Sequence, residues 1–279
     1  MLLNPLEHKT QKVACNTKNT NYAYTEYFPF IAMRKKKDLI SELIPILSDT
    51  EKLEKFIMKH SNLPGPRGNL ELAFALADIY ENFDVLIEWT RISEDQADVN
   101  NPKFFLAFCS VVCLGNIYTK RKNKKIISIL KKLANDGRWR MKEAVAFGFQ
   151  LIGEHDFREL QKIFSDWIIK SNNLEKRAIL VSLAHPPLLN NAHTEFCFEI
   201  ADTVLKEMDR ENDFDVLRKG LEFTISVFVA ANPKMGFSFI KRWIGKDKVI
   251  NKIMKENLKK NRLIKKYPEE VMSLLGQIK

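Results

Sequence analysis

The stretch DGRWRMKEAVAFGFQLI, residues 136–152, decides the fold because its pattern returns along the chain. It opens with Asp136, a residue type that caps helix N-termini, and the basic residue Lys142 lies near the start of the helix that follows. Four other segments share this pattern, and their aligned basic residues are Lys103, Arg177, Arg218 and Lys252. The intervals from Lys103 to Lys252 are 39, 35, 41 and 34 residues. The pattern is therefore an internal repeat.

A period of about 40 residues is typical of HEAT and armadillo arrays. The residues expected to cap the repeated helices are Asn101, Asp136, Asn173, Asp213 and Asp247. Amphipathic segments precede four of them, at residues 124–134, 157–170, 194–208 and 233–245. Short loops make consecutive helices antiparallel, and such pairs must stack to bury their apolar faces. The sequence predicts an all-α fold, a right-handed α-solenoid of stacked antiparallel HEAT-like helix pairs.

Composition supports helices and sets the expected domain boundary. The chain has only 10 Gly and 10 Pro, which cluster instead of punctuating it as turns between β-strands would. Residues 1–32 are polar and then aromatic without helical periodicity, so we expect a poorly ordered leader. From Lys35 onward apolar residues recur at spacings of three and four. The predicted solenoid domain spans residues 33–279.

Charge and apolar runs indicate the class of partner and the compartment. A net charge of +10 suits an anionic partner, with nucleic acid as the first candidate and an acidic protein or membrane surface as the second. The longest apolar runs, Phe104 to Gly115 and Phe223 to Ala231, are too short to span a bilayer. The four cysteines have no C-x-x-C spacing and are interpreted as reduced core residues. We expect a cytoplasmic monomer without membrane contact.

Basic residues concentrate in two regions, at positions 120–142 and 246–266. If they line the inner helices they would follow a phosphate backbone; the alternative is a solvated helix face. The positions expected to bind nucleic acid in these regions are Lys124, Lys125, Lys255, Lys259, Lys260 and Arg262. Residues 71–98 are instead acidic, so the two ends of the solenoid are expected to bind different surfaces.

From Leu63 to about Tyr267 the chain resembles bacterial HEAT-like proteins of the DNA alkylation repair family, the alkylpurine DNA glycosylases. The resemblance is carried by LPGPRGNLELA, DGRWRMKEAVAFGFQLI, LEKRAILVSL and SVFVAANPKMGFSFIKRWIGKDKVINKIMKENLKKNRL. It implies a concave groove with a basic lining, tryptophans and a carboxylate near the extruded sugar. The D-x-x-W spacing from Asp136 to Trp139 matches this arrangement.

The resemblance implies excision of N-alkylated purines by a DNA-3-alkylpurine glycosylase-like hydrolase, with Asp136 as the catalytic carboxylate and Trp139 as the aromatic contact. The alternative is that Asp136 is a helix cap and Trp139 fills the turn between repeats. Arg138 and Arg140, on either side of the tryptophan, are expected to contact the ligand. We expect Arg177 and Arg218 to bond the caps of neighbouring repeats instead.

The functional hypothesis is a HEAT-repeat protein that binds nucleic-acid backbone, principally DNA, in a basic concave groove, and acts in alkylation repair. The alternative is a non-enzymatic α-solenoid scaffold that binds a protein partner. No cofactor is expected, because nucleotide-binding and hydrolase motifs are absent from the sequence. Neither is a metal site, because His185, His193 and Cys197 do not complete a four-ligand zinc set.

Overall fold

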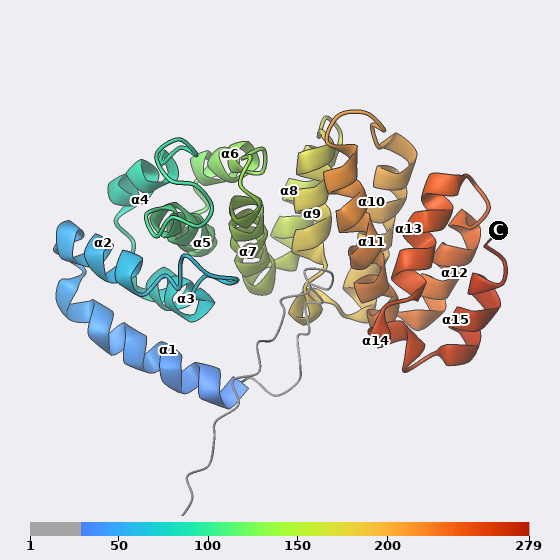
Figure 1. The fold of residues 1–279 in the computed structure, drawn as a ribbon, viewed down its shortest axis with the longest axis horizontal. Coiled ribbons are helices and arrows are strands. Elements are labelled where there is room, and N and C mark those ends of the chain that lie inside the picture. Colours follow the sequence, from blue (N-terminus) through green and yellow to red (C-terminus); the bar gives the residue numbers. More distant parts are fainter. Residues whose placement is uncertain (1–28, 279) are drawn as a thin grey trace, which may run out of the picture.

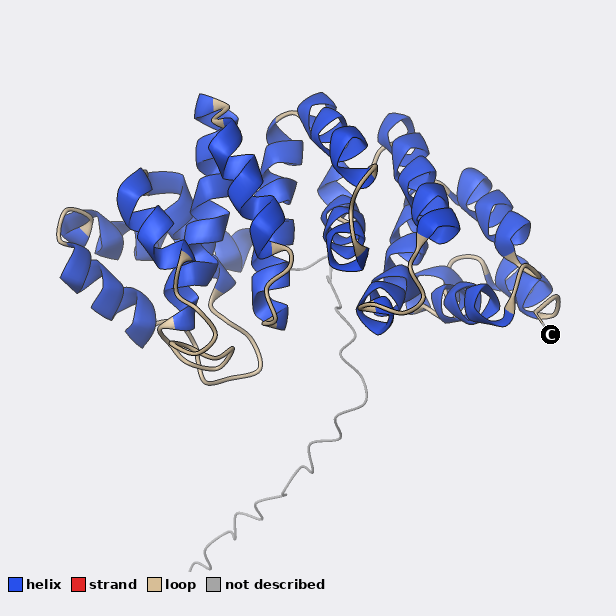
Figure 2. Ribbon diagram, turned by 90° about the horizontal axis from the view of Figure 1, so that it is seen from above, coloured by secondary structure: helices blue, strands red, loops and turns tan. Residues whose placement is uncertain are grey.

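A computed structural model of the chain describes residues 29–278, and the described part is all-helical (Figures 1 and 2). The first half contains α1 (Pro29–Leu43), α2 (Thr50–Lys59), α3 (Leu70–Ile79), α4 (Phe83–Thr90), α5 (Phe104–Arg121), α6 (Lys124–Leu133) and α7 (Trp139–His155). The second half contains α8 (Phe157–Ile168), α9 (Asn173–Leu183), α10 (Asn191–Glu207), α11 (Phe214–Ala231), α12 (Pro233–Trp243), α13 (Lys248–Leu258), α14 (Asn261–Ile264) and α15 (Pro268–Leu275). Two short 3₁₀ helices, Ile44–Ile46 and Pro186–Leu188, complete the elements.

The expected boundary at residue 33 falls inside α1, which begins at Pro29. Most of the predicted leader, residues 1–28, lies outside the described residues.

From α5 to α13 most helices lie in two rows along the long axis of the molecule (Figure 1). In one row α5, α7, α9, α11 and α13 pack successively against each other. In the other, α8 packs on α10 and α10 on α12, and each of these also packs on the flanking helices of the first row. The five aligned basic residues all lie at or near the start of a first-row helix. The repeat in the sequence therefore corresponds to a repeat in packing.

The core is densest where α5 crosses α7. Helix α5 buries fourteen consecutive or near-consecutive positions between Phe104 and Tyr118. Gly115 of α5 lies directly against the backbone of Gly148 of α7, since a Cβ added at Gly115 would lie 2.5 Å from the Gly148 Cα. Two glycines at one crossing let the backbones approach more closely than any other residue pair would allow.

Two of the five expected caps lie close to the position that the sequence predicted. Asp247 is the N-cap of α13, and its carboxylate accepts a hydrogen bond from the Ile250 N–H at 2.9 Å. Helix α9 is capped one residue earlier than expected, by Asn172, which forms a capping box with Glu175. Asn173 is instead the first helical residue and is buried.

The other three expected caps differ in detail. Asp136 accepts from the backbone N–H of Arg138, which itself occupies the N-cap position of α7. Asn101 likewise accepts from the N–H of Lys103 ahead of α5. Asp213 occupies the N-cap position of α11 with a left-handed backbone and makes no side-chain cap bond. The prediction of a side-chain cap at Asp213 was wrong: the residue has a left-handed backbone, whereas residues whose side chains cap a helix usually have an extended one.

Long polar side chains connect consecutive repeats by hydrogen bonds to backbone carbonyls of the next loop. Asn173 donates from Nδ2 to the carbonyls of Asp209 and Asn212, at 2.6 Å each. Lys176 donates to the carbonyl of Glu207 at 2.7 Å. Arg218, expected to bond a neighbouring cap, instead pairs with residues of its own helix, Asp215 and Glu222. The expectation for Arg218 was wrong, because carboxylates three positions before and four positions after it on the same helix lie within ion-pair distance.

Among the described residues, no helix has the length and apolar character needed to cross a membrane. Cys109, Cys113 and Cys197 are buried free thiols. Burial raises the pKa of Cys197 to about 12, so this thiol stays protonated at neutral pH.

Candidate nucleic-acid interface

The Asp136 carboxylate is fully engaged by Arg138. Its Oδ1 accepts from the Arg138 backbone N–H at 2.8 Å and from Nε at 2.9 Å, and its Oδ2 accepts from Nη2 at 2.6 Å. The Asp136 side chain is 14% exposed and that of Arg138 only 2%. A carboxylate held in a bidentate ion pair is neutralised and oriented by its partner, so Asp136 is not a free base facing solvent.

The other donors of Arg138 also point into the protein. Nη1 donates to the Ala97 carbonyl at 3.0 Å and Nη2 to the Ile92 carbonyl at 2.9 Å. The guanidinium carbon lies 4.9 Å from the centre of the Phe104 ring. Arg138 was expected to contact a ligand. That expectation does not fit this geometry, because every nitrogen of the guanidinium is bonded to the loop before α5 or to Asp136.

Trp139 is half-exposed, at 44%, and is the first residue of α7. The guanidinium carbon of Arg140 lies 4.3 Å from the centre of its ring. Arg140 itself is buried and donates to the carbonyls of Gly65 at 2.5 Å and Pro66 at 3.5 Å. Because Trp139 is half-exposed, the alternative in which its ring fills the turn between repeats does not fit the structure. Arg140 is bound to carbonyls of the loop between α2 and α3.

Lys142 completes a buried basic group behind this tryptophan. Its ammonium donates to the carbonyls of Asp136 at 2.5 Å and Gly137 at 3.2 Å. Burial lowers the pKa of Lys142, and the nearby Arg177 lowers it further. Arg138, Arg140 and Lys142 thus hold loop carbonyls in place and do not form an exposed basic surface.

Much of the remaining basic region at positions 120–142 is occupied by contacts within the protein. Lys120 and Arg121 both pair with Glu81, at 2.6 Å each. Lys125 lies over the Phe83 ring at 5.8 Å, and Lys131 over the Trp167 ring at 5.3 Å. Lys124 and Lys125 are exposed at the start of α6, and no described carboxylate forms an ion pair with either of them.

The second basic region remains open on α13. Four exposed lysines follow each other at spacings of four, three and four residues: Lys248, Lys252, Lys255 and Lys259. This spacing places them on one helix face, opposite the buried Ile250, Ile253, Met254 and Asn257. We call these four residues the α13 lysine stripe. Of these four lysines, only Lys259 forms an ion pair with a described carboxylate, that of Glu256 at 3.1 Å.

Two further cations follow the α13 lysine stripe in the sequence. Lys260 is the N-cap residue of this short helix and Arg262 is its second residue. Burial lowers the pKa of Arg262, and within the described part of the chain no carboxylate forms an ion pair with it. The four exposed lysines of the stripe, with Lys260 and Arg262 next in the chain, make this C-terminal segment strongly basic.

The sequence prediction named Lys255, Lys259, Lys260 and Arg262 as positions that bind nucleic acid. Lys248 and Lys252 belong to the same basic region, and their helical spacing places them on the same face as Lys255 and Lys259. In the described range, no group of three or more His, Cys, Asp and Glu side chains is arranged to hold a metal ion.

Comparison of the chain with family models, curated proteins and solved structures found no match.

Proposed function

We propose that this protein binds the phosphate backbone of nucleic acid, principally duplex DNA, through the α13 lysine stripe and Arg262. The fold that we propose for it is a right-handed α-solenoid of HEAT-like antiparallel pairs, with the stripe along its concave groove. The two rows of successively packed helices and the 34- to 41-residue repeat support this proposal. In this view α13 and α14 form the binding end of the array.

The observation that carries the proposal is the α13 lysine stripe, in which Lys248, Lys252 and Lys255 have no ion-pair partner among the described residues. From Lys248 to Lys259 it rises about 16 Å along the helix, the length of about five phosphates along one strand of B-DNA. Asp215 on α11 attracts Lys252, but its ion pair is with Arg218. Polyanion binding would release counterions from phosphates facing these lysines, which favours association at low salt.

The resemblance to alkylpurine glycosylases also implies base excision. Our proposal covers binding alone, because Asp136 is held by Arg138 at both carboxylate oxygens. Trp139 remains an exposed aromatic ring on which an unpaired base could stack.

Fluorescence anisotropy with a labelled 20-base-pair duplex over a salt series tests the proposal. The test variant carries Lys248→Gln, Lys252→Gln and Lys255→Gln. Its charge-matched control carries Lys59→Gln, Lys162→Gln and Lys170→Gln, three exposed lysines on α2 and at α8. The slope of log affinity against log salt should become shallower by about 0.9 for each phosphate that the test variant no longer neutralises.

The control should bind like the wild-type protein. If the test variant and the control lost the same affinity for the duplex, binding would depend on net charge alone, which would contradict a defined interface. Salt-independent binding, or none at low salt, would overturn the proposed function.

A further inference from the structure

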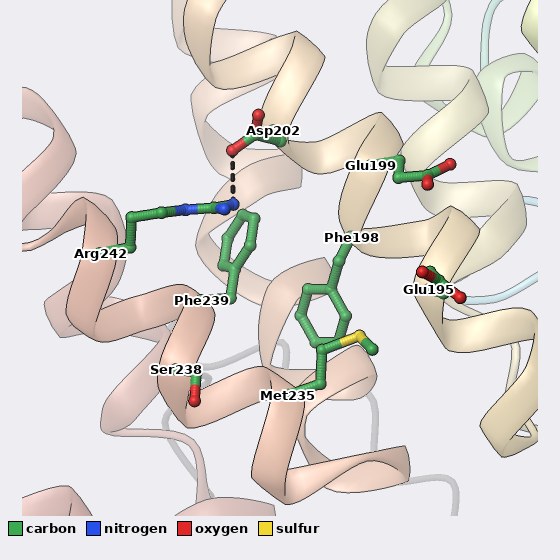
Figure 3. Close-up of a pocket in the computed structure, with 8 residues that line it drawn as sticks. All are labelled: Glu195, Phe198, Glu199, Asp202, Met235, Ser238, Phe239 and Arg242. Carbon is green, nitrogen blue, oxygen red and sulfur yellow. Dashed lines mark hydrogen bonds and ion pairs between the residues drawn. The ribbon is translucent and has the colours of Figure 1, made fainter.

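A groove between α10 and α12 has an apolar floor. Phe198 of α10 and Phe239 of α12 meet there with ring centres 5.1 Å apart, and Met235 lies beside them (Figure 3). Both phenylalanines are buried, whereas Met235 is partly exposed. The floor therefore offers an apolar contact between two helices of the second row.

The rim of the groove on α10 is acidic. Glu195 and Glu199 lie one helical turn apart and are both exposed. Among the described residues neither has an ion-pair partner. Asp202, one turn further, closes the groove: its carboxylate accepts from Arg242 at 2.7 Å, from the Trp243 indole at 3.1 Å and from Lys206 at 2.5 Å.

We propose that this groove docks a basic amphipathic helix of a partner protein, which places lysine or arginine side chains against Glu195 and Glu199 and an apolar side chain on Met235. Charge complementarity selects this occupant. The chain carries a net charge of +10, so two unpaired carboxylates beside an apolar floor are a local exception that attracts cations. An anionic ligand would be repelled by the same carboxylates.

The dimensions of the groove define the motif of the partner. From Glu195 to Asp202 the rim rises about 10 Å, or two helical turns. A bound helix therefore presents two basic residues at positions i and i+4, with an apolar residue at i+3 or i+7 as the anchor. The ion pairs of Asp202 hold the closed end rigid, so the partner contacts the two free carboxylates.

The test uses a fluorescein-labelled 14-residue helical peptide of leucine and lysine, with leucines on one face. Anisotropy is measured with the full chain, and also with peptides in which glutamate replaces lysine or serine replaces leucine. We expect the leucine–lysine peptide alone to bind. The double variant Glu195→Gln, Glu199→Gln removes two exposed ion pairs with the peptide, which should weaken binding about fivefold.

Glu269→Gln with Glu270→Gln on α15 is the charge-matched control and should bind the peptide as the wild-type chain does. Met235→Ser should weaken binding without loss of helicity by circular dichroism. Unchanged affinity in the Glu195→Gln, Glu199→Gln variant, or equal binding of the glutamate peptide, would overturn the proposal. The duplex-binding assay tests the α13 lysine stripe with a different ligand and different variants. Either proposal can therefore fail without the other.

Discussion

At the scale of single residues, burial divides the basic side chains into two kinds. Arg138 and Lys142 are buried and bond loop carbonyls, whereas Lys252 and Lys255 project from α13 without a described ion-pair partner. A buried cation must be compensated inside the protein, because its desolvation costs several kcal/mol. Only the second kind retains enough hydration and freedom to meet a phosphate.

Arg138→Met should destabilise the fold. The variant leaves the Asp136 carboxylate and the carbonyls of Ile92 and Ala97 without their donor, and breaking a buried ion pair from one side costs about 3–5 kcal/mol. Urea denaturation measures the free energy of unfolding. Adding Asp136→Asn to Arg138→Met should recover part of the loss, since the unpaired charge is then removed.

Trp139→Ala serves as the neighbouring control, and its free energy of unfolding should change by about 1 kcal/mol or less because the ring is half-exposed. A wild-type stability for Arg138→Met, combined with weaker binding of duplex DNA, would contradict the structural role that we give Arg138.

The limits of sequence prediction are clearest at Arg138 and Arg140. Spacing predicted the helix that follows them, because capping and apolar periodicity are local properties. It could not predict that Arg138 reaches the Ile92 carbonyl, or that Arg140 reaches the Gly65 carbonyl 75 residues away in the chain. An arginine beside an exposed tryptophan has the same local pattern whether its guanidinium faces solvent or an earlier loop.

At the scale of elements, adjacent repeats are joined by a few polar contacts between helix ends. Glu81, between α3 and α4, accepts from Lys120 and Arg121 at the end of α5. The hydrogen bond from Lys120, followed by that from Arg121, lowers the pKa of Glu81. The ionised form is thus favoured in the folded state, and the contribution to stability depends on pH.

Glu81→Gln should destabilise the protein only where Glu81 is ionised. A lowered folded pKa means that the stabilisation is complete above the unfolded value near 4.5 and disappears as pH falls through the folded value. Because these pairs are partly exposed, we expect a difference of about 1 kcal/mol or less at pH 7. Urea titrations of both proteins from pH 7 to pH 3 measure this difference.

Glu211→Gln, at an exposed position without a described ion pair, should show no such pH-dependent difference. A deficit in Glu81→Gln that stays constant down to pH 3 would mean that charge pairing at Glu81 does not stabilise the fold.

The register of the repeats was predictable at this scale, but the exact cap was not. Asn172 and Asn173 are adjacent and both suited to cap α9. Glu175 decides between them, because its side chain bonds back to the N–H of Asn172 while Asn173 turns to the carbonyls of the next loop. The bond from Asn173 depends on where residues 209–212 lie, which periodicity does not specify.

At the scale of the whole molecule, each helix packs mainly on its neighbours in the two rows, so stability should be distributed unevenly along the chain. Helices α7 and α9 have packed neighbours on both sides, whereas α15 packs mainly on α13 and α14. In such an array an end helix can open while the centre stays folded. The α13 lysine stripe lies next to this less constrained end.

Hydrogen exchange followed by mass spectrometry should therefore find slow exchange in α5, α7 and α9 and faster exchange in α15. Duplex DNA should slow exchange in α13 and α14, since a ligand that bridges their cations opposes opening of this end. The groove between α10 and α12 should be unaffected. Equal protection of α15 and α7 in the free protein would mean that the chain unfolds as one cooperative unit. If duplex DNA slowed exchange mainly in α6 and α7, the DNA-binding surface would instead include Lys124, Lys125 and Trp139.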